Sequence, residues 1–316
     1  MINRELIRIK IVQLTYAYYQ NGNKNIDTAE KELFFSLSKA YDLYNMMLAL
    51  IVAVSKAANR RLEVGRARAR RERKPEPSAK FALNRFALQL ADNKQLQEFI
   101  AEQKYPWDEE PEFVEKLLTQ MEQTEFYQEY MASEVDDYNS DRELWRRLYR
   151  LLIQDNDDLD ALLEEKSLYW NDDKQVVDSF VLKTIKRFDE KNGPKQELLP
   201  EYDSEEERDY ARKLFRATIL NADEYQRCMS DASRNWDFSR LAFMDVVIMQ
   251  IAIAEMLTFP SIPLSVTINE FVELSKIYST PRSYGYVNGM LDAIARHLVN
   301  SGKLMKQLEV KEPTDN

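Results

Sequence analysis

The stretch SYGYVNGMLD, residues 283–292, poses the question from which the fold can be argued. Apolar residues recur at helical spacing from Val287 to Leu298, which predicts an amphipathic helix. Yet Asn288 and Gly289 stand side by side in its first turns, and each costs roughly 0.5–1 kcal/mol relative to alanine inside a helix. We therefore expect a contact outside the helix to compensate for them.

The composition favours helices. The chain has 316 residues, enough for one large or two modest domains with a hydrophobic core. It contains only 6 glycines and 10 prolines, which is few for a protein built of hairpins. The predicted fold class is therefore all-α.

The residues that catalysis and metal binding need are scarce. The single histidine, His297, and the single cysteine, Cys228, cannot form a zinc cluster or a Cys–His pair. The sequence also lacks a P-loop and a Gly-x-Gly-x-x-Gly turn. We expect no enzyme activity, no catalytic residue, no metal site and no cofactor, and we expect Cys228 to be a small buried hydrophobe or, alternatively, a reactive thiol.

Charge and hydropathy point to a cytoplasmic protein. A lone cysteine cannot form an internal disulfide, which fits a reducing compartment. The uncharged apolar runs at 46–54 and 246–254 are shorter than the ~18–20 residues of a membrane span. Charged residues also interrupt residues 1–20 too often for a signal peptide. We expect a cytoplasmic location and no membrane partner.

Apolar spacing predicts a series of helices along the chain. They are expected at 4–20, from 28 into a basic segment near 60–74, and at 81–103, 111–132, 141–154, 157–169, 174–189, 207–228, 235–257 and 262–278, followed by the helix quoted above. Asp237 is the expected N-cap of the helix at 235–257.

Charge is distributed unevenly. Between residues 105 and 165, 19 Asp/Glu stand against 5 Lys/Arg, so this part is expected to face water and to repel nucleic acid. From 234 to 306 the count is 7 Lys/Arg against 6 Asp/Glu. The segment 60–74 carries eight Lys/Arg, interrupted only by Glu63 and Glu72, and we expect these cations to have no Glu partner at close range. It is either a solvated helix end or a phosphate-binding surface.

The C-terminal third resembles the NusB family. The matching residues, in chain order, are Trp236, Asp237, Arg240, Asp245, Ile251, Ala252, Glu255, Pro263, Ile268, Asn269, Glu270, Glu273, Leu274, Lys276, Tyr286, Val287, Asn288, Gly289, Leu291 and Asp292. The similarity extends more weakly to residues 1–20 and to about 208–233. Within such a bundle, Gly289 would let a neighbouring helix approach closely, and Asn269 and Asn288 would bind backbone groups or simply brace the fold with Glu273.

The resemblance implies a helical bundle in two subdomains, interrupted after the first helix by a long helical insertion at about 21–205. We expect residues 1–233 to form an N-terminal subdomain that includes the insertion, residues 234–306 to form the C-terminal subdomain, and residues 307–316 to be a flexible tail. The first helix departs from the family pattern, because Glu5 and Leu6 stand where basic residues are expected.

The resemblance also implies a function. A protein of this family would bind the boxA element of ribosomal RNA transcripts together with the small-subunit ribosomal protein NusE, within an RNA polymerase antitermination complex. Single-stranded RNA is held by Arg/Lys on phosphates and by aromatic rings on bases. The candidate RNA-binding residues are Arg4, Arg8, Tyr16, Tyr18, Arg282, Ser283 and Tyr286, with Arg66, Arg68, Arg70 and Arg71 of the basic segment, and the candidate partner-binding residues are Asp245, Glu255 and Glu273.

Two other functions remain open from the sequence. NusB-like domains also precede the catalytic domain of some ribosomal RNA cytosine methyltransferases, but this region ends the sequence and no glycine-rich cofactor turn lies upstream. The second alternative is a protein-interaction scaffold that binds no RNA and uses the acidic inserted helices. Binding of boxA RNA, with and without NusE, would separate these functions.

Overall fold

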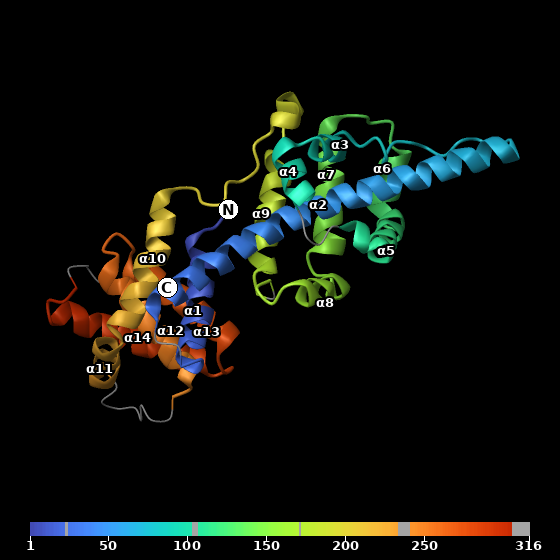
Figure 1. The fold of residues 1–316 in the computed structure, drawn as a ribbon. Helices are drawn as coiled ribbons and strands as arrows, with labels where there is room; N and C mark the ends of the chain where they lie inside the picture. The colour runs from blue at the N-terminus through green and yellow to red at the C-terminus, as the bar shows by residue number, and fades with distance from the viewer. Residues whose placement is uncertain (23–24, 103–106, 171, 233–240, 305–316) are drawn as a thin grey trace, which may run out of the picture. The chain divides into compact units, whose positions relative to one another are not determined.

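A computed structural model of the chain describes residues 1–22, 25–102, 107–170, 172–232 and 241–304 (Figure 1). In these ranges the regular elements are helices, and one isolated bridge pairs Ile2 with Tyr202. The prediction of an all-α fold is therefore confirmed.

The helices follow one another along the chain. Their bounds are α1 (Arg4–Gln20), α2 (Ile26–Glu72), α3 (Arg85–Ala91), α4 (Lys94–Glu102), η1 (Trp107–Glu109), α5 (Pro111–Glu122), α6 (Glu125–Ala132), α7 (Tyr138–Leu148), η2 (Tyr149–Ile153), α8 (Asp157–Lys166), α9 (Lys174–Arg187), η3 (Glu190–Lys195), α10 (Glu205–Leu220), α11 (Ala222–Ala232), α12 (Phe243–Thr258), α13 (Leu264–Tyr278) and α14 (Ser283–Asn300).

The chain forms two compact units. Unit 1 consists of Met1 and Ser38–Glu201, and unit 2 consists of Ile2–Leu37 and Tyr202–Asn316. Helix α2 contributes its first turns to unit 2 and its remaining turns to unit 1. The subdomain boundaries expected from the sequence stay a prediction.

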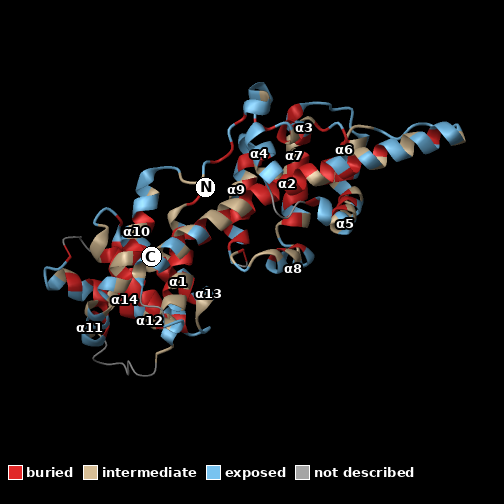
Figure 2. Cartoon of the chain, viewed as in Figure 1, coloured by how far each residue is buried: buried red, intermediate tan, exposed pale blue. Residues whose placement is uncertain are grey.

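Unit 2 is built around α12. This helix packs against α1, α10, α11, α13 and α14, and most of its side chains are buried, as the red ribbon in Figure 2 indicates. A helix that is apolar on every side needs partners on every side. The dense apolar sequence from Val247 to Met256 thus places α12 at the centre of the unit.

Several predicted helices are shorter in the structure because polar side chains bind the backbone at their ends. The helix expected at 81–103 is divided into α3 and α4, where Asn84 and Asn93 accept hydrogen bonds from the amides of Ala87 and Leu96. Asparagine favours such caps over helix interiors. The expected helices at 111–132 and 207–228 are likewise each divided in two, near Thr124 and Asn221.

The helix expected from residue 235 begins later. Helix α12 starts at Phe243, with Ala242 at its N-cap position. The expected cap Asp237 lies outside the described residues, as do Trp236 and Arg240 of the quoted motif and the tail at 307–316.

The expectation for Gly289 is wrong. Helix α14 forms as predicted, with Val287 and Leu291 fully buried. Gly289 and Asn288, however, are exposed, and a Cβ added at Gly289 would meet nothing within 4 Å. Among the described residues no neighbouring helix approaches Gly289, so burial of the opposite face of α14 is what compensates for these two residues.

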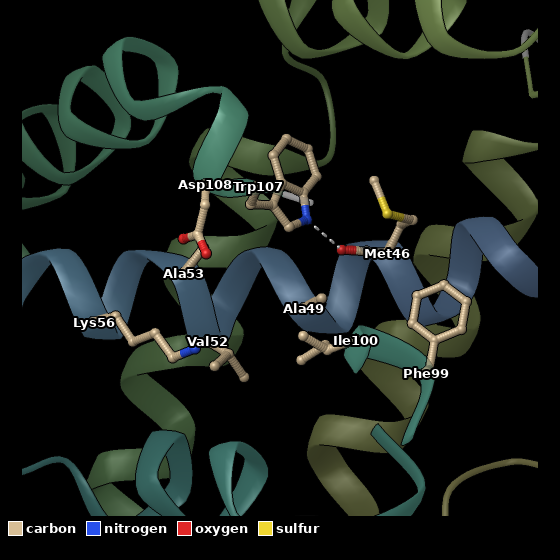
Figure 3. Close-up of a pocket in the computed structure, with 9 residues that line it drawn as sticks. All are labelled: Met46, Ala49, Val52, Ala53, Lys56, Phe99, Ile100, Trp107 and Asp108. Carbon is tan, nitrogen blue, oxygen red and sulfur yellow. Dashed lines mark hydrogen bonds between the residues drawn. The ribbon is translucent and has the colours of Figure 1, made fainter. Parts of the chain in front are cut away.

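Unit 1 is organised around the long helix α2. The buried Tyr44 hydroxyl lies 2.7 Å from Thr184 Oγ1 of α9, and Trp170 Nε1 donates to the carbonyl oxygen of Lys39. Figure 3 shows how Trp107 of η1 donates its indole N–H to the carbonyl oxygen of Met46. The same view shows a pocket between α2, α4 and η1. Its lining is mainly apolar, as in a gap between packed helices.

Helix α2 is long and apolar enough to cross a membrane by length and composition, which the count of uncharged runs did not reveal. In its most apolar window, however, 72% of the residues are buried inside the protein. Such burial is typical of the core helix of a soluble fold.

A charged cluster lies inside unit 1. Asp178 accepts hydrogen bonds from Tyr149 (2.5 Å) and Lys174 (3.0 Å), and Lys174 also lies 3.3 Å from Asp160. Burial raises the pKa of Asp178 to about 6, because it outweighs the attraction of the Lys174 ammonium group. Burial also raises the pKa of Tyr149.

Candidate nucleic-acid interface

Aromatic side chains gather where the end of α1 meets the start of α12. Phe243 contacts Tyr16 and Tyr19 with ring centroids 5.6 Å and 6.1 Å apart, and Tyr18 lies edge-on to Tyr19 at 5.6 Å. The Tyr19 hydroxyl accepts a 2.7 Å hydrogen bond from Gln250. Tyr16 and Phe243 are 38% and 44% exposed, so two of these rings offer surface to a ligand.

The start of α14 reaches the same end of α12. Ser283 is buried, and its hydroxyl donates a 2.8 Å hydrogen bond to Asp245 Oδ2. Burial, and then the nearby Asp245 carboxylate, raise the pKa of the half-buried Tyr286. Arg282 is exposed and forms no ion pair with the described residues.

These contacts surround one turn of α12, because Phe243 and Asp245, two residues apart, point to different sides of the helix. Phe243 and Asp245 both belong to the first turn of α12, and they hold the tyrosines of α1 and the start of α14 against it. We call Tyr16, Phe243, Arg282 and Tyr286 the α12 surface. It combines exposed rings with an unpaired cation, which are the groups that single-stranded nucleic acids bind.

The structure does not bring Arg4 and Arg8 to this surface. They precede Tyr16 on α1 by twelve and eight residues, which correspond to about 18 Å and 12 Å of helix. Arg4 is half-exposed and 3.4 Å from Glu207, and its guanidinium lies over the ring of Tyr210. Their grouping with the tyrosines, which the sequence suggested, is therefore not seen in the structure.

Arg8 is an interior residue. Its Nε donates a 2.7 Å hydrogen bond to Glu255, and its Nη1 donates a 3.2 Å hydrogen bond to Glu270. Burial alone would lower the pKa of Arg8, but Tyr210 and the two carboxylates raise it. The interior position of Arg8 corrects the expectation that it lies free for RNA, and Lys10 is equally buried.

The three candidate partner-binding residues have different environments. Glu255 is fully buried and accepts from Arg8, Tyr210 and Thr267, so both of its oxygens are occupied. Asp245 is buried too, but its Oδ1 has no hydrogen-bond partner among the described residues. Glu273 is exposed on α13, where it pairs with Lys276.

The expected lack of Glu partners in the basic segment is wrong. Arg66 and Arg70 pair with Glu76, and Arg68 and Lys74 pair with Glu72. Glu76 lies beyond the helix, in a return segment whose Pro77 comes within 3.1 Å of a Cβ placed on Gly65. Arg71 is exposed and forms no ion pair with the described residues.

The sequence did not predict two members of the aromatic cluster. Tyr19 and Phe243 are not among the candidate residues of the sequence analysis. An aromatic residue in the first turn of a buried helix is a usable signal, because that turn lies at the edge of the core. No group of three or more potential metal ligands occurs in the parts of the chain that the structure describes.

The described residues form an all-helical protein. Its unit 2 encloses the apolar helix α12 and exposes aromatic rings and the cation Arg282 around the first turn of that helix. The family model described as "NusB family" matches residues 180–296. The matched range includes α10 to most of α14 and does not reach α1.

Relatives support the same assignment. The chain is 33% identical over 132 residues to transcription antitermination protein NusB of Salinibacter ruber, covering 40% of this chain and 82% of that protein. It is 37% identical over 99 residues to the protein of that name from Chloroherpeton thalassium, covering 31% and 47%. With the Natranaerobius thermophilus protein, identity is 39% over 89 residues, covering 28% and 64%. The chain therefore belongs to the NusB family. No solved structure matches it significantly.

Proposed function

We propose that this protein is a transcription antitermination factor that acts in the cytoplasm and binds boxA-type single-stranded RNA together with the ribosomal protein NusE, within an RNA polymerase antitermination complex. The observation that carries the proposal is the α12 surface in a member of the NusB family. Tyr16 and Phe243 are the proposed stacking rings, and Arg282 is the proposed phosphate contact.

The exposed face of α13 is the proposed contact for NusE. Val266, Asn269, Glu273 and Ile277 lie within one stripe of the helix, and Val266 and Ile277 are 40% and 62% exposed. Large apolar side chains on an exposed helix face favour a protein partner.

The test measures binding of boxA RNA and of a scrambled RNA at constant salt, with and without NusE. We expect NusE to raise the affinity for boxA RNA at least tenfold, a coupling of about 1.4 kcal/mol. Equal affinity in both conditions would contradict the proposal. Absence of RNA binding in either condition would favour the alternative, a protein-interaction scaffold that uses the acidic inserted helices.

One variant tests the NusE contact by itself. Ile277→Asp places a charge on the exposed face of α13 and should abolish the NusE effect while leaving binding of RNA alone unchanged. The matched control is Leu168→Asp, because Leu168 is 82% exposed on unit 1 and lies on no proposed surface. If both variants retain the NusE effect, the contact lies elsewhere.

A further inference from the structure

The second half of α2 and the return segment that follows it carry a strong local positive charge. Residues 60–80 contain nine Lys/Arg and three Glu, in a chain whose net charge is −10. All of these residues belong to unit 1. In Figure 2 the C-terminal end of α2 is mostly pale blue, so most of its residues are exposed.

Most of these cations are already paired. Arg61 donates to Glu115 and Glu122 of α5, each at 2.6 Å. The other pairs, described above, use the segment's own Glu72 and Glu76, and Glu63 pairs with Arg66. Among the described residues, these pairs involve all three glutamates of residues 60–80.

Three exposed cations lie on one face of α2, and a fourth follows the helix end. Lys56, Arg60, Arg71 and Arg73 are exposed and form no ion pair with the described residues. At 100° per residue, Lys56, Arg60 and Arg71 lie within about 60° of one another around α2 and extend over about 22 Å. Arg73 follows at the helix end, and Val64, 71% exposed, lies on the same face.

Stabilisation of the helix does not account for this face. Cations in the last turn interact favourably with the helix dipole, and that explains Arg70 and Arg71. The effect falls off within one turn, so it does not reach Lys56 or Arg60. An exposed row of unpaired cations on a protein of net negative charge instead favours a polyanion.

We propose that the face of α2 formed by Lys56, Arg60 and Arg71, together with Arg73 at the helix end, binds the phosphate backbone of single-stranded RNA without reading its bases. This inference rests on the proposed function, because it adds a second contact with the same class of ligand. Phosphate contacts position a strand and do not specify its sequence. This face would therefore hold RNA that flanks the specific element.

The experiment uses the full-length protein, a uridine-rich single-stranded RNA without boxA, and no NusE. The variant Arg60→Gln/Arg71→Gln/Arg73→Gln removes three free cations. The matched control Arg147→Gln/Arg150→Gln/Lys186→Gln removes three exposed cations of unit 1 that form no ion pair with the described residues and lie on other helices.

Each phosphate contact on a single strand contributes about −0.7 to the slope of log affinity against log salt. The α2 variant should flatten this slope by about 2 and lower the affinity at least about tenfold near 0.1 M salt, whereas the control should change neither. The inference would be overturned if both variants changed the slope and affinity equally, or if the α2 variant changed neither. It would also be overturned if sedimentation showed that the α2 variant has a different oligomeric state and that this difference explains its lower RNA affinity.

The proposed function is tested separately. If the α2 variant loses affinity for uridine-rich RNA while boxA preference and the NusE effect are absent from the wild type, the inference stands and the proposed function fails. If boxA preference and the NusE effect are present but the slope is unchanged, the inference fails and the proposed function stands.

Discussion

The guanidinium of Arg8 and the carboxylate of Glu255 form a 2.7 Å ion pair that is almost completely excluded from solvent. Tyr210 and Thr267 donate to the same carboxylate, so three elements, α1, α10 and α13, converge on one residue of α12. The pair therefore joins the helices of unit 2 rather than presenting a charge to a ligand.

Arg8→Met should destabilise the protein by about 3–5 kcal/mol, because it leaves a buried carboxylate without its countercharge. Arg4→Met is the control and should change stability by about 1 kcal/mol or less, since the Arg4–Glu207 pair is partly exposed. Urea unfolding measures both. If Arg8→Met had wild-type stability and bound RNA poorly, Arg8 would be the RNA contact that the sequence suggested.

Tyr16→Ala should lower RNA affinity by about 1–3 kcal/mol if the ring stacks on a base. Tyr286→Ala should do the same, whereas a purely structural Tyr286 would lower the melting temperature and spare the affinity of the folded fraction. Phe35→Ala is the control, because Phe35 is a similarly exposed aromatic residue of unit 2, 47% accessible. Melting temperature and RNA binding measured on the same samples separate the two roles.

The raised pKa of Asp178 makes stability depend on pH. Its pKa in the folded protein is about 6, against an ordinary value of 3.8, so protonation of Asp178 stabilises the fold. That contribution is complete below about pH 4 and is lost as pH rises through about 6.

Asp178→Asn has no proton to lose, so it should gain stability relative to the wild type between pH 4 and pH 7, by on the order of 1–3 kcal/mol. Urea unfolding at several pH values measures this difference. Asp158→Asn is the control, since Asp158 is an exposed carboxylate that pairs with Lys116 outside this cluster, and its difference from the wild type should change little. A constant difference for Asp178→Asn would contradict the expectation.

Gly289→Ala should stabilise the protein by about 0.5–1 kcal/mol, because Gly289 is an exposed helical residue and an added Cβ meets no atom within 4 Å. The same change at Gly302, just past the end of the same helix, should destabilise it, since Gly302 has φ +70. Thermal unfolding should show a higher melting temperature for Gly289→Ala and a lower one for Gly302→Ala than for the wild type. A loss of stability in Gly289→Ala would indicate that a neighbouring helix does approach Gly289 closely, as the sequence suggested.

Composition and apolar periodicity were sufficient for the fold class and for most helices. The face of α14 around Val287 and Leu291 is buried as predicted, because periodic burial is a local property of the chain. Helix ends were less predictable. Asn84 and Asn93 begin new helices because their side chains bind particular amides, and the sequence alone did not indicate which asparagines would do so.

The candidate surface was predictable only in part. Tyr16, Arg282 and Tyr286 were chosen for their residue types, and the structure brings them together around the first turn of α12. Arg8 and Arg66 were chosen for the same reason, but both meet carboxylates. Glu255, which pairs with Arg8, is 247 residues later in the sequence, so no local sequence pattern reveals this pairing.

Residue type and spacing are enough to predict that the chain is helical and where positive and negative charges accumulate. Which of these charges are free depends on the tertiary contacts. An arginine binds a ligand or a neighbouring carboxylate according to what the fold places within about 4 Å of it, and at that range an available partner inside the protein is preferred over water. For this reason Arg8 is part of the core, while Arg60 and Arg71 remain on the surface.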